Sequence, residues 1–222
     1  MARKIPLVTG EFYHVFNRGV ENRPVFLDKK DYRRAKEALE FYRFANLPVK
    51  LSHLFLLSSE DRKKILSDLK KKDQKLVEIV SFCFMPNHFH FLLKQAVENG
   101  ISKFLGNFTN SFTRYFNTRH KRVGPLFQGV FKSVHIETEE QLLHVSRYIH
   151  LNPLVSFVVG EKDFETFPWS SLPEFLTGKG GICQTEIILG HFKSPLAYKE
   201  FVLDQADYAK KLEAIKHFLL EN

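Results

Sequence analysis

Cysteine, tryptophan and long apolar runs are scarce in this chain, and each scarcity excludes a class of protein. The 222 residues include two cysteines and one tryptophan. Cys83 and Cys183 stand far apart, and no Cys-x-x-Cys pair exists, which excludes a structural zinc ribbon. So few thiols fit a reducing, cytoplasmic setting. The first residues lack the apolar core of a signal peptide and no apolar run could span a bilayer, so we expect no membrane association.

Acidic residues are absent from one long stretch of an otherwise basic chain. The net charge is +8 and the pI about 9.4, which favours a polyanionic partner, nucleic acid before an anionic membrane. No carboxylate stands between Glu98 and Glu137, where basic and aromatic residues interleave. This pattern fits phosphate neutralisation with base stacking, and it fits equally a solvated basic helix with an aromatic core face.

The order of the predicted elements indicates an α+β fold. We expect strands over residues 11–18, 77–85, 88–94 and 126–136, with Pro86-Asn87 turning the second strand into the third. Helices are predicted from the N-cap Asp28 to about Asn46 and over residues 101–119. This is the βαββαβ order of a ferredoxin-like antiparallel sheet with helices on one face.

Three further regions complete the predicted organisation. Residues 51–72 predict a helical excursion, with Ser58 or Ser59 capping its main helix, inside a domain of residues 1–164 whose insertion covers about 50–73. Thr138 and Gln141 form a capping box for a third helix from Glu139 to about Leu151, which Pro153 should end at Asn152. Residues 165–222 read as a C-terminal helical extension.

The segment Met85-Pro86-Asn87-His88-Phe89-His90-Phe91 is the most informative part of the chain. Alternation along a strand places His88 and His90 on the same side, roughly 6–7 Å apart, and sends the two phenylalanines into the core. Two neutral imidazoles on one rigid strand are half of a metal site. The alternative is a pair of ordinary, half-buried strand histidines.

The third helix carries a phenol and an amide on one face. Tyr148 and Asn152 are four residues apart, about 6 Å along the helix axis. Taken alone, Tyr148 could be a core tyrosine and Asn152 a helix C-cap ahead of proline.

Together these motifs resemble the single-tyrosine HUH transposases, named for the His-hydrophobe-His pair. The REP-associated tyrosine transposases are the most similar branch, and the resemblance covers about residues 10–175. It rests on Met85–His90 and on Arg147-Tyr148-Ile149-His150-Leu151-Asn152-Pro153, with support from three shorter segments. These are Tyr13-His14-Val15-Phe16-Asn17-Arg18-Gly19, Gly124-Pro125-Leu126-Phe127-Gln128-Gly129 and Trp169-Ser170-Ser171.

The resemblance implies a role for each site residue. His88 and His90 match the paired ligands of a divalent cation, Mg²⁺ or Mn²⁺. Tyr148 matches the nucleophile, and its attack would leave a 5′-phosphotyrosine and a free 3′-hydroxyl. Asn152 matches the third ligand, although the insertion-sequence branch carries the longer Gln there. Tyr115 also lies in a basic helix but lacks the Asn-Pro context, so it is a decoy.

The resemblance also implies a substrate, which is single-stranded DNA carrying a hairpin beside a short guide. Asn17 and Arg18 are candidates for contacting the guide. Candidates for phosphate contacts in the basic stretch are Arg114, Arg119, Lys121, Arg122 and Lys132, for each of which the alternative is an ordinary surface charge. Arg147, beside Tyr148, is a further candidate DNA-binding residue. We expect a cytoplasmic, nucleoid-associated protein, a monomer as in the REP-associated branch, while the insertion-sequence relatives imply a homodimer.

Two readings without catalysis stay open. One is a ferredoxin-like module that grips structured DNA or RNA without cutting it, and the other is a degenerate transposase that binds hairpins as a regulator. The intact His-Phe-His and Tyr-x-x-x-Asn patterns argue against both.

Overall fold

A computed structural model describes residues 7–178 and 180–206, and these form a sheet covered by helices. Four antiparallel strands lie in the order β2-β3-β1-β4. Their bounds are β1 Phe12–Arg18, β2 Val77–Met85, β3 His88–Gln95 and β4 Lys132–Ile136. With the two crossover helices, this order is the split βαβ arrangement, so the ferredoxin-like α+β prediction is confirmed.

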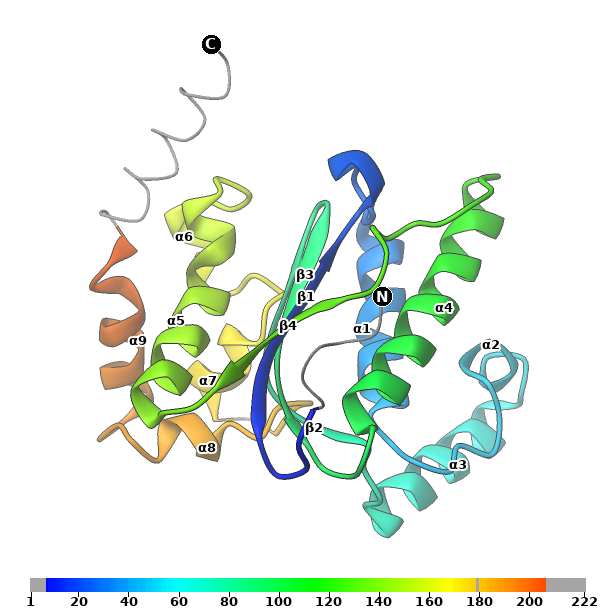
Figure 1. Cartoon of the computed structure of the whole chain (residues 1–222), viewed down its shortest axis with the longest axis horizontal. Coiled ribbons are helices and arrows are strands. Elements are labelled where there is room, and N and C mark those ends of the chain that lie inside the picture. Colours follow the sequence, from blue (N-terminus) through cyan, green and yellow to red (C-terminus); the bar gives the residue numbers. More distant parts are fainter. Residues whose placement is uncertain (1–6, 179, 207–222) are drawn as a thin grey trace.

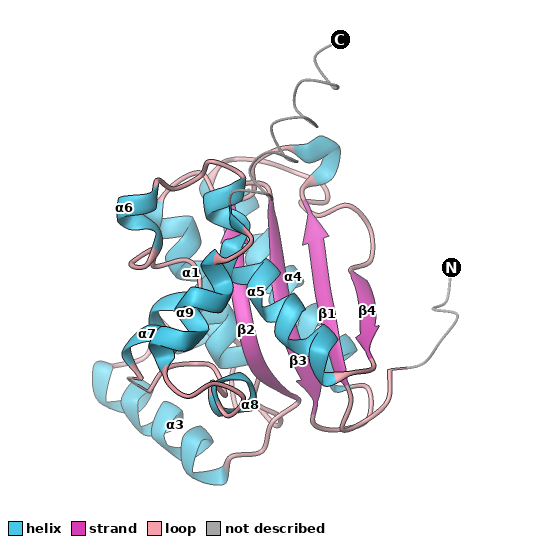
Figure 2. Ribbon diagram, turned by 90° about the vertical axis from the view of Figure 1, so that its left-hand side faces the viewer, coloured by secondary structure: helices cyan, strands magenta, loops and turns pink. Residues whose placement is uncertain are grey.

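Helices cover the two faces of the sheet in different ways (Figure 1). The crossover helices α1 (Lys29–Tyr42) and α4 (Gly100–Arg119) share one face, as expected. The excursion forms α2 (Leu51–Leu54) and α3 (Ser59–Lys72), and a short 3₁₀ helix, Val20–Asn22, follows β1. The other face is covered by α5 (Glu139–Val155), which lies across the strands (Figure 2), and by the helices that follow it. Those helices are α6 (Glu161–Phe164), α7 (Leu172–Thr177), α8 (Glu186–Leu189) and α9 (Pro195–Leu203).

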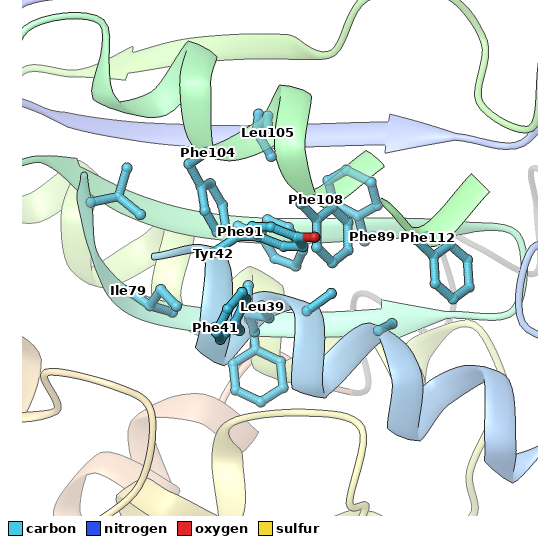
Figure 3. Packing of buried hydrophobic residues seen from close by; sticks show 14 of the residues in the cluster. Leu39, Phe41, Tyr42, Ile79, Phe89, Phe91, Phe104, Leu105, Phe108 and Phe112 are labelled. Atoms are coloured by element: carbon cyan, nitrogen blue, oxygen red, sulfur yellow. The ribbon is translucent and has the colours of Figure 1, made fainter. Parts of the chain in front are cut away.

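Aromatic rings fill the core between the sheet and α1 and α4 (Figure 3). Phe89 and Phe91 of β3 pack edge-to-face on Phe108 of α4, with ring centroids 5.3 and 5.4 Å apart. Phe104 and Phe112 extend the same stripe along α4 and are fully buried. The phenylalanines of α4 therefore form a core face, and they are not available as stacking platforms for bases.

A second core joins α5 to β2 and to the C-terminal extension. It contains Ile149 and Leu154 of α5 together with Tyr198 and Val202 of α9. The segment Trp169–Ser171 lies along the outer edge of β2, where Phe84 N donates to Trp169 O and Ser171 N donates to Phe82 O, both at 2.9 Å. The first part of the extension is thus packed onto the sheet. The last part of the predicted helical extension, residues 207–222, lies outside the described residues.

Three predicted boundaries are wrong. The helix α1 ends at Tyr42 and not near Asn46, because the backbone beyond it forms hydrogen bonds with residues 74–76. Ala45 N donates to Gln74 O, and Arg43 O accepts from Leu76 N. The strand β4 starts at Lys132, because the preceding loop turns at Gly129 with φ +62°. The helix α5 continues through Pro153 to Val155, since proline removes one helical hydrogen bond but Leu154 is held in the second core.

None of the helices in the described ranges combines the length and apolarity that a membrane span requires.

Two glycines of α4 make a matched test of this packing. A methyl group on Gly100 would lie 2.1 Å from Leu76 O, whereas one on Gly106 would meet nothing within 4 Å. We expect Gly100→Ala to lower the free energy of unfolding by about 1–3 kcal/mol through overpacking. Gly106→Ala should raise it by about 1 kcal/mol, because alanine is the better helix former. Urea denaturation followed by circular dichroism measures both, and a Gly100→Ala protein as stable as wild type would contradict the close approach.

Candidate active site

The strand β3 presents both histidines of the His-Phe-His motif toward α5. Alternation buries Phe89 and Phe91 in the first core and leaves His88 and His90 on the opposite side, as the sequence predicts. The two imidazole ring centroids are 4.8 Å apart, with their planes nearly perpendicular. Two ring nitrogens from one strand are thus close enough to share a ligand.

A third histidine, His14 of β1, belongs to the same cluster, although the sequence predicts no metal-binding or catalytic role for it. In the β1–β3 register His90 pairs with Phe16 and Leu92 with His14, so these side chains share a face. His14 Nε2 lies 2.9 Å from His90 Nδ1, and the two rings stack at 5.1 Å. Alternation with the buried Tyr13 and Val15 could have placed His14 on the opposite face of the strand. Only the pairing register between β1 and β3 shows that it lies beside His90.

A hydrogen bond orients the ring of His88. Asn87 donates its Nδ2 to Asn22 O at 3.2 Å, which turns its Oδ1 toward His88 Nδ1, 2.6 Å away. An amide oxygen only accepts, so Nδ1 of His88 is the donor in this contact.

Burial keeps the other two imidazoles neutral. Burial, and then the neighbouring His88 and His14, lower the pKa of His90 well below its ordinary value. Burial also lowers the pKa of His14 to about 4. Neutral imidazole is the form that binds a metal ion, so burial favours the ligating form of His90 and His14.

Tyr148 of α5 stands over this cluster. Its ring edge faces His90 at 5.4 Å and His14 at 5.9 Å between centroids. The side chain is 52% exposed, so Tyr148 is not a core tyrosine and its hydroxyl can reach a ligand from solvent. All of these side chains come from one chain.

Asn152 lies one helical turn beyond Tyr148, in the last turn of α5, and is buried; the C-cap residue is Ser156. Its Oδ1 accepts a long hydrogen bond of 3.5 Å from Ser156 Oγ, and its buried Nδ2 has no hydrogen-bond partner. A buried amide left incomplete in this way suits a missing ligand, because rotation of the amide presents the oxygen where the nitrogen now lies. Among the described residues no three His, Cys, Asp or Glu side chains form a metal-binding group.

A buried hydrogen-bond chain fixes α5 on the sheet. His150 lies between Tyr198 Oη at 2.6 Å and Ser171 Oγ at 2.7 Å, and Ser171 Oγ in turn accepts from Phe82 N of β2 at 2.9 Å. Burial lowers the pKa of His150 to about 3, so the ring stays neutral and bridges the two hydroxyls. The position of Tyr148 is therefore set by the contacts of His150, two residues further along the same helix.

The candidate DNA-binding residues near the end of β1 surround the loop before β4. Asn17 is buried and donates its Nδ2 to Gly129 O at 3.3 Å, while Arg18 Nε donates to Gln128 Oε1 at 2.7 Å. Lys132 pairs with Phe16 in the β1–β4 register, so it lies on the same face of the sheet as His90. Lys132 is exposed and supplies a positive charge on that face.

Several other candidate cations make contacts within the protein. Arg119 forms ion pairs with Asp28, the N-cap of α1, and with the fully buried Asp31. Arg122 donates to Asn117 Oδ1 and Pro125 O. Arg147 donates to His144 Nδ1 and stacks on Phe201 of α9, while Arg114 and Lys121 are exposed.

Comparison with known proteins adds two findings. Residues 54–152 match the model of the IS200-like transposase family. Among solved structures, the chain resembles a REP-associated tyrosine transposase bound to a REP hairpin, with a TM-score of 0.51 and 16% sequence identity. That likeness covers 82% of this chain and 88% of the other, and at this identity it speaks for the fold. No curated protein matches.

The ion pairs of Arg119 predict a structural role that its neighbour Arg114 lacks. We expect Arg119→Gln to lower the melting temperature clearly, because it leaves the buried Asp31 without its arginine, and Arg114→Gln to leave it unchanged. The Arg119 hydrogen bond holds the pKa of the Asp28 carboxyl well below its ordinary value. This contribution is therefore present at neutral pH and is lost only in strong acid. Thermal melts of both variants at neutral and acid pH measure the difference, and equal melting temperatures at pH 7 would refute the assignment.

Proposed function

We propose that this chain, whose residues 54–152 match the IS200-like transposase family, cuts and rejoins single-stranded DNA at hairpin-containing sites through a covalent bond to Tyr148. One observation carries the proposal. An exposed phenol, on a helix fixed by buried contacts, stands beside two neutral histidines of the same chain. A family of transposases supports DNA-acting chemistry in general, and this geometry supports the tyrosine as the nucleophile.

The residues present fit a divalent cation. His88 and His90 would hold Mg²⁺ or Mn²⁺ together with the amide of Asn152, whose side chain lacks a hydrogen-bond partner for its Nδ2. When bound, such an ion polarises the scissile phosphate and stabilises the charge that develops on it.

The side chains of this protein supply the nucleophile and the positioning. The Tyr148 hydroxyl oxygen forms a bond to the phosphorus and loses its proton, while the bond from phosphorus to the 3′ oxygen breaks and that oxygen gains a proton. The products are a 5′-phosphotyrosine and a free 3′-hydroxyl. Because the phosphotyrosine keeps the energy of the broken bond, a 3′-hydroxyl can later attack it and rejoin strands without ATP.

The substrate follows from the exposure of the site. A phenol at the surface of α5 reaches a phosphate most readily when the strand is outside a duplex. The similar structure was determined with a REP hairpin, and a hairpin with a single-stranded flank is the substrate we propose here. Arg18 and Lys132 lie on the same face of the sheet as His88 and His90, and they are the cations we propose for contacts with that flank. A chromosomal substrate of this kind would place the protein in the cytoplasm.

Replacement of the nucleophile is the direct test. Incubated with a labelled hairpin DNA and Mn²⁺, the wild-type protein should form a covalent adduct that survives denaturing electrophoresis. Tyr148→Phe removes the oxygen that forms the bond, so the adduct should fall to background while hairpin binding is kept. EDTA should also abolish the adduct in the wild type.

Tyr115→Phe is the matched control, because Tyr115 lies on α4, on the other side of the sheet. It should form the adduct at the wild-type rate. Hairpin binding by the wild type without any adduct, across many hairpins, would favour a binding module instead.

We propose that His14 is a positioning residue for His90. Its Nε2 contact with His90 Nδ1 directs the other nitrogen of His90 toward the cation site, and such supporting contacts are worth roughly 10–100-fold in metal affinity. His14→Ala should therefore weaken Mn²⁺ binding to the DNA-free protein by that factor, as measured by electron paramagnetic resonance.

Two further variants separate this role from a general loss of histidine. His14→Gln offers an amide oxygen to His90 and should recover part of the affinity. His144→Ala removes an exposed histidine of α5 and should change nothing. Unaltered Mn²⁺ affinity in His14→Ala would rule out the positioning role.

A further inference from the structure

A basic cavity of about 940 Å³ lies among α1, α4 and residues 47–53, on the face of the sheet opposite Tyr148. None of the described carboxylates lines it. Its positively charged or titratable lining residues are Arg34, Lys50, His53, Arg114 and Arg119. A concave surface with cations and without acids favours an anionic ligand.

Arg34 is the unusual member of this lining. The residue is 9% exposed, its Nε has no hydrogen-bond partner, and within the described residues it forms no ion pair. Its guanidinium lies 4.7 Å from the Phe55 ring and 5.4 Å from the Tyr115 ring, so two aromatic faces hold it in place. Glu37 lies near enough to favour the charged form of Arg34 but does not pair with it. A buried cation without a partner is costly, which points to an anion supplied from outside.

The neighbouring Arg119, by contrast, is paired within the protein. It forms ion pairs with Asp28 and Asp31. In the described part of the chain neither Arg114 nor Lys50 has such a partner. Two exposed cations at the rim and one buried cation therefore remain for a ligand.

The rest of the lining suits a phosphodiester chain. Asn107, Asn110 and Ser111 of α4 add neutral hydrogen-bond donors between the cations. Asn110 also lines a second cavity, of about 970 Å³, which extends under residues 125–131 to Asn17 at the end of β1. The two cavities thus share Asn110 of α4, and the second reaches Asn17, a candidate for contacting the flank of the hairpin.

We infer that the cavity around Arg34 binds backbone phosphates of the DNA substrate, as an accessory contact on the face away from Tyr148. The inference rests on the proposed function for the identity of the ligand. Arg34 forms the floor of the site, and Arg114 and Lys50 form its rim. The contact would hold the DNA independently of cleavage, so it can be tested without a reaction.

Binding is measured in the Tyr148→Phe background, by fluorescence anisotropy with a labelled DNA hairpin carrying a single-stranded 5′ flank. Each rim variant, Arg114→Gln and Lys50→Gln, should weaken binding roughly tenfold. Each should also reduce the slope of log K against log salt by about 0.7–0.9, the loss of one phosphate contact. Lys64→Gln and Lys71→Gln on α3 remove the same charge outside the cavity and should leave affinity and slope nearly unchanged.

Arg34→Met separates a ligand-binding role from a structural one. Methionine keeps an apolar side chain between Phe55 and Tyr115 without the unpartnered charge. The melting temperature should therefore hold or rise while binding weakens. A fall in melting temperature with unchanged binding would mean that Arg34 serves only packing, and the inference would be overturned.

The failures of the two proposals can be told apart. If the wild type forms the Tyr148 adduct but the rim variants bind like the α3 controls, the cavity is not a DNA contact and the proposed chemistry stands. If no adduct forms but the rim variants lose affinity and salt slope, the cavity is a DNA contact and the proposed chemistry is wrong.

Discussion

The docking of α5 on the sheet is the constraint on which the candidate site depends. The histidines sit on β3, and the phenol sits on a helix whose own sequence does not specify where it packs. The buried chain from Tyr198 through His150 and Ser171 to the backbone of Phe82 supplies that position. Because each member is buried and hydrogen-bonded, moving α5 would leave several polar groups unpaired, which makes the placement of Tyr148 rigid.

The sequence predicts what depends on short-range pattern. Alternation in β3 separates His88 and His90 from the buried phenylalanines, and helical spacing joins Tyr148 to Asn152, both as the structure has them. His14 could not be assigned in this way, because its contact with His90 depends on the register between strands 76 residues apart. The prediction that the helix ends before Pro153 is wrong for a similar reason. Burial of Leu154 in the second core outweighs the local tendency of proline to end a helix.

Charge is where the sequence was least informative. Arg114 and Arg119 look alike in the basic stretch, yet the structure gives Arg119 two aspartate partners from α1 and its N-cap and leaves Arg114 exposed. Arg34, outside the stretch altogether, is buried and forms no ion pair with any described residue. Tertiary packing decides which positive charges are internally balanced, and a count of basic residues along the chain cannot show it.

The segment Trp169–Ser171 has a consequence for assembly. By pairing with Phe82 and Phe84 it occupies hydrogen-bonding groups along the outer edge of β2, which an additional strand would need. Growth of the sheet by edge-to-edge association is thereby restricted to the side of β4, a strand of five residues with few hydrogen bonds to offer. Any pairing of two copies through their sheets would have to be short, or use surfaces other than the strands.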